Sequence, residues 1–290
     1  MTQIHTRIAD LVAALHAHRQ RGERIVFVPT MGNLHEGHES LMRAAREHGE
    51  CVVASIFVNR LQFGPAEDFD RYPRTFESDL QRLQACGVTH LFAPDEKELY
   101  PTPQHTFVEP EAFLQSTLDG EFRHGHFRGV ATVVLKLFNI VAPHVAIFGR
   151  KDFQQLRVIE NMVRELNLPI EIIGAPTVRA DDGLALSSRN GYLNASEREA
   201  AKRLFQVLKD VAHALRDGHT DISALEAAAL SRLSENNWKP QYVAVRRALD
   251  LQPVSAIQCA ADGPQGLVVL GAAYIGSTRL IDNVEVTADF

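Results

Sequence analysis

The sequence predicts an α/β protein in which a doubly wound parallel sheet is followed by a smaller α+β domain. Two observations predict this fold class. Up to about Ala175, short apolar, β-branched runs alternate with longer segments of helical period, which indicates βαβ units in a parallel sheet covered on both faces. Beyond Ala175, helical segments come first and strand-like segments follow without helices between them, which is typical of a separate α+β domain.

The strands of the first part are expected at IVFVP (25–29), CVVASIFV (51–58), VTHLFA (88–93), HVAIFG (144–149) and IEIIGA (170–175). The helices between them are expected at 38–48, 75–86, 129–141 and 151–166. The segment 129–141 fits a strand by residue propensity, but its length and the preceding Phe127-Arg128-Gly129 favour a helix.

The second part begins with a loop over 176–193. We expect a helix after it, with Ser196 as N-cap and Glu199 completing a capping box, and a second helix over 221–235. Strands are expected at 241–247, 266–275 and 278–286. The predicted domains are therefore a nucleotide-binding domain over 1–177 and a smaller lid domain over 178–290, with a hinge near 175–180.

The composition is that of an ordinary globular protein, with 45% hydrophobic and 23% charged residues. Thirty Lys and Arg against 36 Asp and Glu give a net charge of −6, which argues against binding to nucleic acid or to anionic membrane. No run approaches the ~18 uninterrupted apolar residues of a membrane helix. The N-terminus also lacks the pattern of a secretory signal.

The cysteines Cys51, Cys86 and Cys259 are far apart in the sequence and odd in number. They form no CxxC pair and no Cys/His cluster along the chain, so we expect neither a disulfide framework nor a zinc site. Together with the missing secretory signal, this cysteine usage predicts a cytoplasmic protein.

The first candidate site is PTMGNLHEGH (29–38), which leaves a predicted strand and enters a helix at about His38. Ligands bind at the C-terminal ends of strands in doubly wound sheets, and the amides of a helix N-terminus favour phosphate. His35 and His38 can donate to one phosphate group, while Gly32 and Gly37 let the backbone approach a ligand. The alternatives are a turn with incidental histidines and, ranked last, a metal site, because no carboxylate or cysteine partner stands out.

Polar groups also follow two other predicted strands. Asn59 and Gln62 are amides that can read hydroxyls or a carboxylate without adding charge, although on their own they describe only a polar loop. Lys151 suits phosphate and Asp152 can accept from ribose hydroxyls. The alternative at this position is a charged helix start, in which the helix dipole stabilises the carboxylate of Asp152.

The last cluster is Ser187-Ser188-Arg189, in the loop between the predicted domains. Two hydroxyls followed by a guanidinium can bind a triphosphate, although a solvated linker would have a similar composition. Gln154 and Gln155 face different sides of their helix, so at most one should reach the same ligand. Chance explains any one of these clusters easily and all of them together poorly.

These motifs resemble the pantoate–β-alanine ligase family, the pantothenate synthetases. The matching segments are PTMGNLHEGH, FVNRLQF, RYPRT (71–75), GHFRGV (125–130), FGRKDFQQL, RADDGLALSSRNGYL and LIDN (280–283). They occur in the family's order and approximate spacing, and they span essentially the whole chain. The resemblance implies a Rossmann-like sheet, a cytoplasmic enzyme and a homodimer.

The resemblance also implies a reaction in two steps. Pantoate attacks the α-phosphate of Mg²⁺-bound ATP, giving pantoyl adenylate and pyrophosphate, and the amine of β-alanine then displaces AMP to form pantothenate. A free carboxylate is a poor electrophile, whereas its mixed anhydride with AMP has a good leaving group. The protein therefore has to align the reactants and stabilise phosphate charge.

Carried over position by position, the resemblance implies catalytic roles for His38, His35, Lys151 and Arg189. It implies ATP contacts for Met31, Gly32, Asn33, Leu34, His35, Glu36, Gly37, His38, Gly149, Arg150, Lys151, Asp152, Val178, Leu186, Ser187, Ser188 and Arg189. Gln62 and Gln155 would bind pantoate, and Asp79 would contact magnesium.

The chain departs from the family pattern at Arg60 and His124, where the family usually has Pro, and at Arg150, where it usually has Glu. Arg150 reverses a charge beside Lys151, and we expect its side chain to face water so that activity survives. Two rival functions remain open: a nucleotidyltransferase that stops at the nucleotidylated product, and a nucleotide-binding regulator that has lost turnover.

Overall fold

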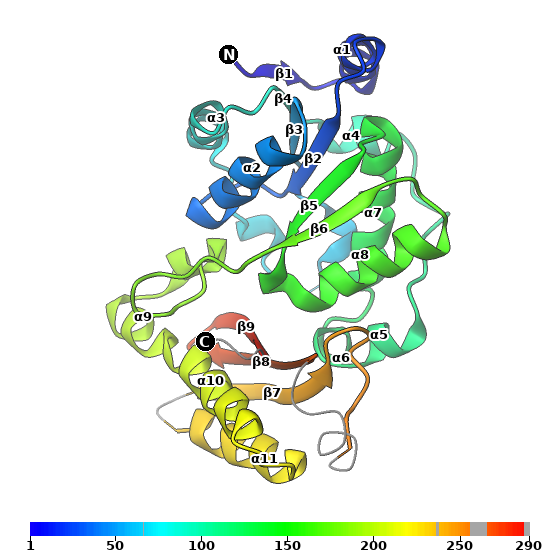
Figure 1. Ribbon diagram of the computed structural model, residues 1–290. Coiled ribbons are helices and arrows are strands. Elements are labelled where there is room, and N and C mark those ends of the chain that lie inside the picture. Colours follow the sequence, from blue (N-terminus) through cyan, green and yellow to red (C-terminus); the bar gives the residue numbers. More distant parts are fainter. Residues whose placement is uncertain (66, 236–237, 256–265, 287–290) are drawn as a thin grey trace. The chain divides into compact units, whose positions relative to one another are not determined.

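The computed structural model describes residues 1–65, 67–235, 238–255 and 266–286 (Figure 1). The chain forms two compact units. The N-terminal unit comprises Met1–Arg150 and Gln155–Thr177. The C-terminal unit comprises the short segment Lys151–Gln154 and the chain from Val178 onward.

The N-terminal unit contains a six-stranded parallel sheet with the strand order β1-β4-β3-β2-β5-β6. Its strands are β1 (Gln3–His5), β2 (Ile25–Thr30), β3 (Cys51–Ile56), β4 (His90–Phe92), β5 (Val145–Gly149) and β6 (Glu171–Ala175). From β2 the chain builds outward on one side through β3 and β4, then returns to build β5 and β6 on the other. The predicted doubly wound sheet is confirmed, and its switch point lies between β2 and β5.

Helices cover both faces of this sheet (Figure 1). They are α1 (Ile8–Gln20), α2 (Glu36–His48), α3 (Phe76–Ala85), α4 (Glu96–Leu99), α5 (Ala112–Ser116), α6 (Asp119–Phe122), α7 (His126–Val141) and α8 (Phe153–Glu165), with 3-10 turns η1 (Arg60–Gln62), η2 (Phe69–Arg71) and η3 (Arg150–Asp152). The helix expected at 129–141 is confirmed as α7. β1 and α1 precede the first predicted element and were not anticipated.

Successive side chains of β2 point to opposite faces of the sheet, which explains why residues 25–28 are all apolar and buried. Val26 and Val28 pack with Met42 of α2 in a buried cluster on one face. Phe27 points to the other face, where its ring meets that of Phe138 of α7 edge-on at 6.4 Å between centroids. A central strand covered on both sides must be apolar at every position.

The C-terminal unit contains an antiparallel sheet in the order β7-β8-β9, formed by β7 (Trp238–Arg247), β8 (Leu267–Ile275) and β9 (Thr278–Val286). Its helices are α9 (Ala195–Ala201), α10 (Arg203–Arg216) and α11 (Ile222–Leu233), and the 3-10 turn η4 (Ser188–Tyr192) precedes them. Leu204 and Leu208 of α10 lie over Gly271 of β8, where a Cβ atom would meet Leu208 at 2.9 Å. The predicted smaller α+β domain is confirmed as a fold class.

The predicted helix cap of this unit is wrong by two residues. Asn194, in extended conformation, accepts from the Glu197 amide at 3.0 Å, and the Glu197 carboxylate accepts from the Asn194 amide at 3.0 Å. Ser196 instead donates its hydroxyl to Asn194 Oδ1. Asparagine is as good an N-cap as serine, so the helix begins at the first of two suitable caps.

Candidate functional site

The turn that follows β2 carries the first candidate motif. Gly32 has φ +83° and Asn33 has φ +52°, a region that Gly and Asn tolerate better than other residues. A Cβ atom at Gly32 would lie 3.1 Å from both Asp79 and Ile56, so the backbone passes very close to α3 and β3. The turn therefore requires glycine for both its conformation and its packing.

Asp79 of α3 stabilises this turn through hydrogen bonds to its backbone. Its side chain is 1% exposed, and its two oxygens accept from the amides of Asn33 at 2.9 Å and Leu34 at 2.7 Å. The Thr75 hydroxyl donates to it as well, at 3.1 Å. Hydrogen bonds to a buried carboxylate are among the stronger ones in proteins, so Asp79 fixes the backbone that presents the histidines.

His35 and His38 lie at the start of α2, which begins two residues earlier than predicted, with His35 as N-cap. His35 Nδ1 accepts from the Gly37 amide at 3.1 Å, and His38 Nδ1 accepts from the His35 amide at 3.3 Å. Since both Nδ1 atoms are acceptors, each neutral ring carries its proton on Nε2. The ring centroids are 4.1 Å apart, so two Nε2–H donors and the helix N-terminus lie together, an arrangement suited to phosphate.

Gln62 lies beside this turn, in η1. Its Nε2 contacts Met31 Sδ at 3.3 Å, and its Oε1 accepts from Asn59 Nδ2 at 3.1 Å. Asn59 is buried and also donates to the Gly129 carbonyl, while Tyr100 donates to Asn59 Oδ1 at 2.9 Å. Asn59 is thus a buried support that orients the Gln62 amide rather than a reader of ligands.

His126 is a supporting residue to which the sequence pattern assigned no role. It is buried, its Nδ1 donates to the Gln62 carbonyl at 2.8 Å, and Arg123 donates to its Nε2 at 2.9 Å. Burial, and then the Arg123 charge, lower the pKa of His126 to about 3, so the ring is neutral. Gly129, a glycine inside a predicted helix, was the signal in the sequence for this close packing. A Cβ atom at Gly129 would clash with the Leu61 carbonyl, because α7 packs closely against η1.

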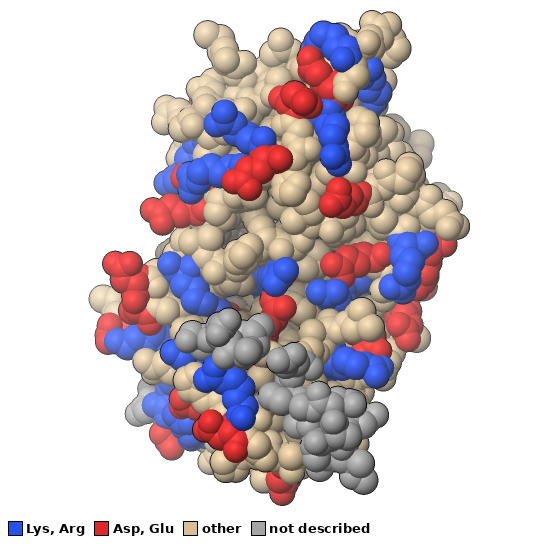
Figure 2. Space-filling model, in the orientation of Figure 1, with Lys and Arg blue, Asp and Glu red and all other residues tan. Residues whose placement is uncertain are grey.

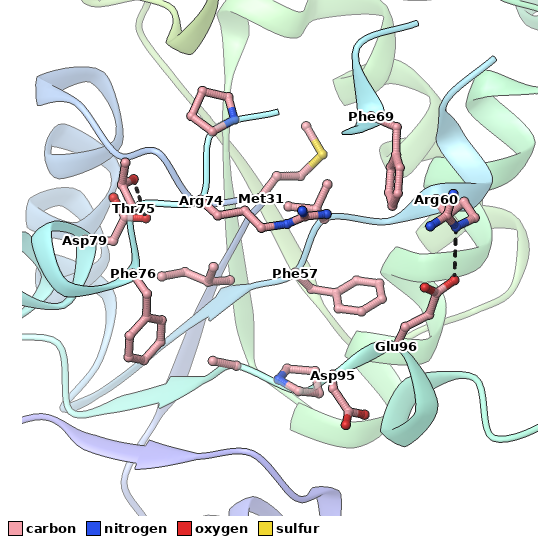
Figure 3. Close-up of a pocket in the computed structure, with 16 residues that line it drawn as sticks. Met31, Phe57, Arg60, Phe69, Arg74, Thr75, Phe76, Asp79, Asp95 and Glu96 are labelled. Atoms are coloured by element: carbon pink, nitrogen blue, oxygen red, sulfur yellow. Dashed lines mark hydrogen bonds and ion pairs between the residues drawn. The ribbon is translucent and has the colours of Figure 1, made fainter. Parts of the chain in front are cut away.

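A cavity of about 340 Å³ opens at the carboxyl ends of β2, β3 and β4 (Figure 3). Met31, Gly32 and Asp79 of the histidine-bearing turn and its support line one side of it. Arg60 and Arg74 line it too, with their guanidinium carbons 3.9 and 5.8 Å from the centre of the Phe69 ring. The carboxylates of Asp79, Asp95 and Glu96 line the cavity as well, so it presents groups of both charges at the carboxyl ends of these strands.

In the C-terminal unit, a partly buried ion pair lies beside the loop that carries several candidate residues. Arg179 binds both oxygens of Asp282, at 2.7 and 2.9 Å, and also donates to the Gly183 carbonyl. Asn283 donates to the Lys151 carbonyl at 2.9 Å. The LIDN segment (280–283) therefore fixes both the loop after Val178 and the backbone at Lys151.

The loop itself is a tight hairpin closed between Arg179 and Ala185. The Leu186 amide donates to the Val178 carbonyl at 3.0 Å, and Ser187 caps η4 by accepting from the Arg189 amide at 3.3 Å. These contacts gather Val178, Leu186, Ser187, Ser188 and Arg189 on one loop.

The structure thus divides the predicted site residues between the units. The N-terminal unit holds Met31, Gly32, Asn33, Leu34, His35, Glu36, Gly37, His38, Gln62, Asp79, Gly149, Arg150 and Gln155, and the C-terminal unit holds Lys151, Asp152, Val178, Leu186, Ser187, Ser188 and Arg189. Of the two neighbouring glutamines, Gln154 is buried and Gln155 is partly exposed.

The model of the pantoate-beta-alanine ligase family matches residues 3–285. The chain belongs to this family. It is 55% identical over 288 residues to the pantothenate synthetase of Leptothrix cholodnii, covering 98% of this chain and 100% of that one. It is 56% identical over 263 residues to the pantothenate synthetase of Nitrosospira multiformis, covering 91% and 92%.

Solved structures of the family agree. Pantothenate synthetase from Thermus thermophilus superposes with a TM-score of 0.90 at 43% identity, covering 98% of this chain and 99% of that chain. Pantoate-beta-alanine ligase from Francisella tularensis, complexed with beta-gamma ATP and beta-alanine, gives 0.81 at 33% identity, covering 99% and 98%. The chain is therefore an enzyme of the ligase type.

Two departures of this chain from the family pattern have structural explanations. Arg60 stacks on Phe69 and pairs with Glu96 at 3.4 Å, both side chains being about half exposed. Arg150 was expected to face water, but its Nε donates to the Gly174 carbonyl at 2.8 Å. Its side chain lies along β6, where Gly174 has no side chain to block it. His124, the third departure, is exposed.

One face of the molecule can be described by its charged side chains. Lys and Arg are interspersed with Asp and Glu over the face drawn in Figure 2, in keeping with the net charge of −6. None of the helices in the described part of the chain is long and apolar enough to cross a membrane.

Proposed function

We propose that this ligase condenses pantoate with β-alanine through a pantoyl-adenylate intermediate, giving pantothenate, AMP and pyrophosphate. The observation that carries the proposal is the juxtaposition of two Nε2–H histidines at a helix N-terminus with a buried, pre-oriented Gln62 at the same sheet edge. The first is suited to phosphate and the second to a small hydroxy acid, and adenylation requires both substrates to be held side by side.

In the N-terminal unit, we assign His35 and His38 to the ATP phosphates. In the first step, the Nε2–H of His38 donates to the phosphate group that is transferred to pantoate. A hydrogen-bond donor that points at developing negative charge lowers the barrier. Gln62 and Gln155 bind pantoate through its hydroxyl and carboxylate oxygens. The glycine-containing turn from Met31 to Gly37 and the backbone at Gly149 and Arg150 contribute to nucleotide binding.

In the C-terminal unit, Lys151 and Arg189 supply positive charge for the phosphates, with the hydroxyls of Ser187 and Ser188. Asp152 accepts from the ribose, and Val178 and Leu186 lie against the adenine. These assignments rest on the family resemblance and on the ion pair and hydrogen bonds that order the loop and the Lys151 backbone.

We further propose that ATP reacts as its Mg²⁺ complex, in a cytoplasmic homodimer. Mg²⁺ prefers carboxylate and phosphate oxygens and is often held by one or two carboxylates plus substrate phosphates. Asp79 has the right donor type, but both its oxygens already accept hydrogen bonds from the turn and Thr75. Its contact with magnesium therefore stays a prediction, and its observed task is to hold the turn.

The proposal is tested by incubating the protein with Mg-ATP and pantoate, with and without β-alanine, and quantifying pyrophosphate, AMP and pantothenate. We expect AMP and pantothenate together only when β-alanine is present. Pyrophosphate without an amide product would favour the nucleotidyltransferase alternative. No turnover by folded protein that binds ATP would favour the regulator. Gln62→Ala should raise the KM for pantoate far more than that for ATP.

A further inference from the structure

The amino ends of the strands of the same sheet carry a second cluster of reactive side chains. His18 of α1, Cys51 at the start of β3 and His90 at the start of β4 bring one ligand atom each to within 4.8 Å of one another. Cys51 is fully buried and His90 is 2% exposed, whereas His18 is partly exposed and gives access from solvent. All of them lie within the N-terminal unit, at the amino ends of strands whose carboxyl ends carry the candidate active site.

From this geometry we propose that His18, Cys51 and His90 form a binding site for a zinc ion, separate from the ligase site. Two imidazoles and one thiolate are a donor set that zinc accepts, with water completing a tetrahedron. The same donors are poor ligands for Mg²⁺, which prefers oxygen. The site would therefore not compete with the metal that accompanies ATP.

The distances leave only a small adjustment. Zn–N bonds of about 2.0 Å in a tetrahedron put two nitrogens about 3.3 Å apart. His90 Nε2 and His18 Nε2 are 2.9 Å apart in the structure, so the rings need to separate by a few tenths of an ångström. The Cys51 sulfur lies within 4.8 Å of both ring nitrogens, and Zn–S and Zn–N bonds of about 2.3 and 2.0 Å would bring it to about 3.5 Å from them.

A carboxylate already orients one of the two histidines, and the ring of His5 contacts the other. Glu23 accepts from His18 Nδ1 at 2.5 Å, which leaves His18 Nε2 as the atom with a lone pair. His5 Nε2 lies 3.0 Å from His90 Nδ1. A carboxylate on the far nitrogen of a metal-binding histidine is a common arrangement that fixes the tautomer and strengthens the ligand.

The proton balance of binding is simple. In the hydrogen-bonded chain, His90 Nε2–H donates to His18 and His5 Nε2–H donates to His90. On binding, the His90 proton moves to its Nδ1 and the His5 proton moves to its own Nδ1, with no net change in charge. Cys51 loses its proton to solvent as the Zn–S bond forms, so one proton is released per ion.

The electrostatics of the cluster agree with these roles. Burial lowers the pKa of His90 to about 4, so its ring is neutral at neutral pH and can act as a ligand. Burial also raises the pKa of Cys51 to about 12, so this sulfur is a thiol until a cation binds beside it. A coordinated thiol is deprotonated by the ion itself.

The test is a titration of the full-length protein, freed of metal with a chelator, using Co²⁺ as a spectroscopic probe and then Zn²⁺. We expect one equivalent of Co²⁺ to produce a thiolate-to-cobalt charge-transfer band, and Zn²⁺ to abolish it by displacement. Cys51→Ala and Cys51→Ser should lose the band, whereas Cys86→Ala, which removes another buried thiol, should keep it. Glu23→Gln should weaken zinc binding ~10- to 100-fold.

Ligase turnover should be the same with and without zinc, because none of these residues belongs to the proposed active site. The proposal fails if wild-type protein shows no charge-transfer band, or if Cys51→Ala binds Zn²⁺ as tightly as wild type. Either result would mean that the cluster is only a hydrogen-bonded chain of histidines. Thermal unfolding of each variant without metal shows whether a lost band reflects a lost fold.

Discussion

The carboxyl ends and the amino ends of the strands in the N-terminal sheet (its carboxyl edge and its amino edge) both carry polar side chains. These side chains find their hydrogen-bond partners in different ways. At the carboxyl edge, Asp79, His35 and His38 bond mainly to backbone amides. At the amino edge, His5, His90, His18 and Glu23 bond to one another. Side chains that accept from backbone amides, such as His35 and His38, are held in one orientation and can point their remaining N–H toward a ligand. Side chains that hydrogen-bond only to one another bring several potential ligand atoms close together, which is the arrangement that we propose for zinc.

The largest effect is expected for His38→Ala, which removes a histidine at the carboxyl ends of the strands. His38→Ala should slow adenylate formation ~10²- to 10⁴-fold, the range for loss of a group that assists proton transfer. Its matched control, His18→Ala, should change that rate less than about twofold. Pantoate-dependent release of pyrophosphate in a single turnover measures both, and an unchanged rate in His38→Ala would remove this residue from the first step.

Deleting the support of the turn should come next. Asp79→Ala leaves the buried Leu34 amide and the partly buried Asn33 amide without this acceptor, at a cost of ~1–3 kcal/mol in the free energy of unfolding. It should also lower kcat/KM ~10²-fold by misplacing the histidines. Thr75→Val removes one of the bonds to Asp79 and should have a much smaller effect. Equal losses in the two variants would show that the carboxylate does not position the turn.

His126 gives a pH-dependent contrast. Its pKa in the folded state, about 3, lies below the ordinary value of 6.5, so between these pH values the unfolded chain binds a proton that the folded chain does not. Its contribution to stability is therefore fully present above about pH 6.5 and is lost as the pH falls toward 3. The slope is at most ~1.4 kcal/mol per pH unit.

His126→Gln keeps an amide donor and acceptor at this position but removes the titration. Urea unfolding of both proteins at several pH values between 6 and 4 isolates the effect, since the histidines of the amino edge titrate equally in each. We expect the wild type to lose stability more steeply than the variant. Parallel curves would contradict the assignment of a neutral, buried ring.

The smallest effect is expected at Arg150. Because its guanidinium binds the Gly174 carbonyl, its charge is held against β6, and Arg150→Glu should change turnover less than tenfold, or ~1.4 kcal/mol in barrier. Steady-state kinetics with saturating ATP, with Arg150→Gln as the uncharged control, measure it. A larger gain for the glutamate variant alone would mean that the reversed charge beside Lys151 impairs this enzyme.

The parallel sheet was predictable because buried parallel strands are apolar at every position, and this pattern survives in short segments. The motif turns were predictable because ligands bind at the ends of such strands. Local competition between caps was harder to read, since Asn194 and Ser196 are both suitable. Arg150 was placed in water because charge alone does not reveal the carbonyl and the glycine that receive it.

Contacts between residues distant in sequence explain the remainder. His126 and Gln62 meet because α7 packs on η1. Cys51 and His90 meet because β3 and β4 are neighbours in the sheet, and α1 brings His18 to them. The sequence offered no CxxC pair or local Cys/His pattern, so the expectation of no zinc site rested on spacing along the chain. Proximity in a parallel sheet depends instead on which strands start side by side.

Gly129 has a practical consequence for engineering the acid specificity that we propose for Gln62. Because a Cβ there would collide with the Leu61 backbone, every substitution at this position moves the segment that carries Gln62. Libraries aimed at new carboxylic acids should therefore keep position 129 constant. Diversity is better placed at side chains such as Met31, which touches Gln62 through a flexible thioether and can be exchanged without displacing a main chain.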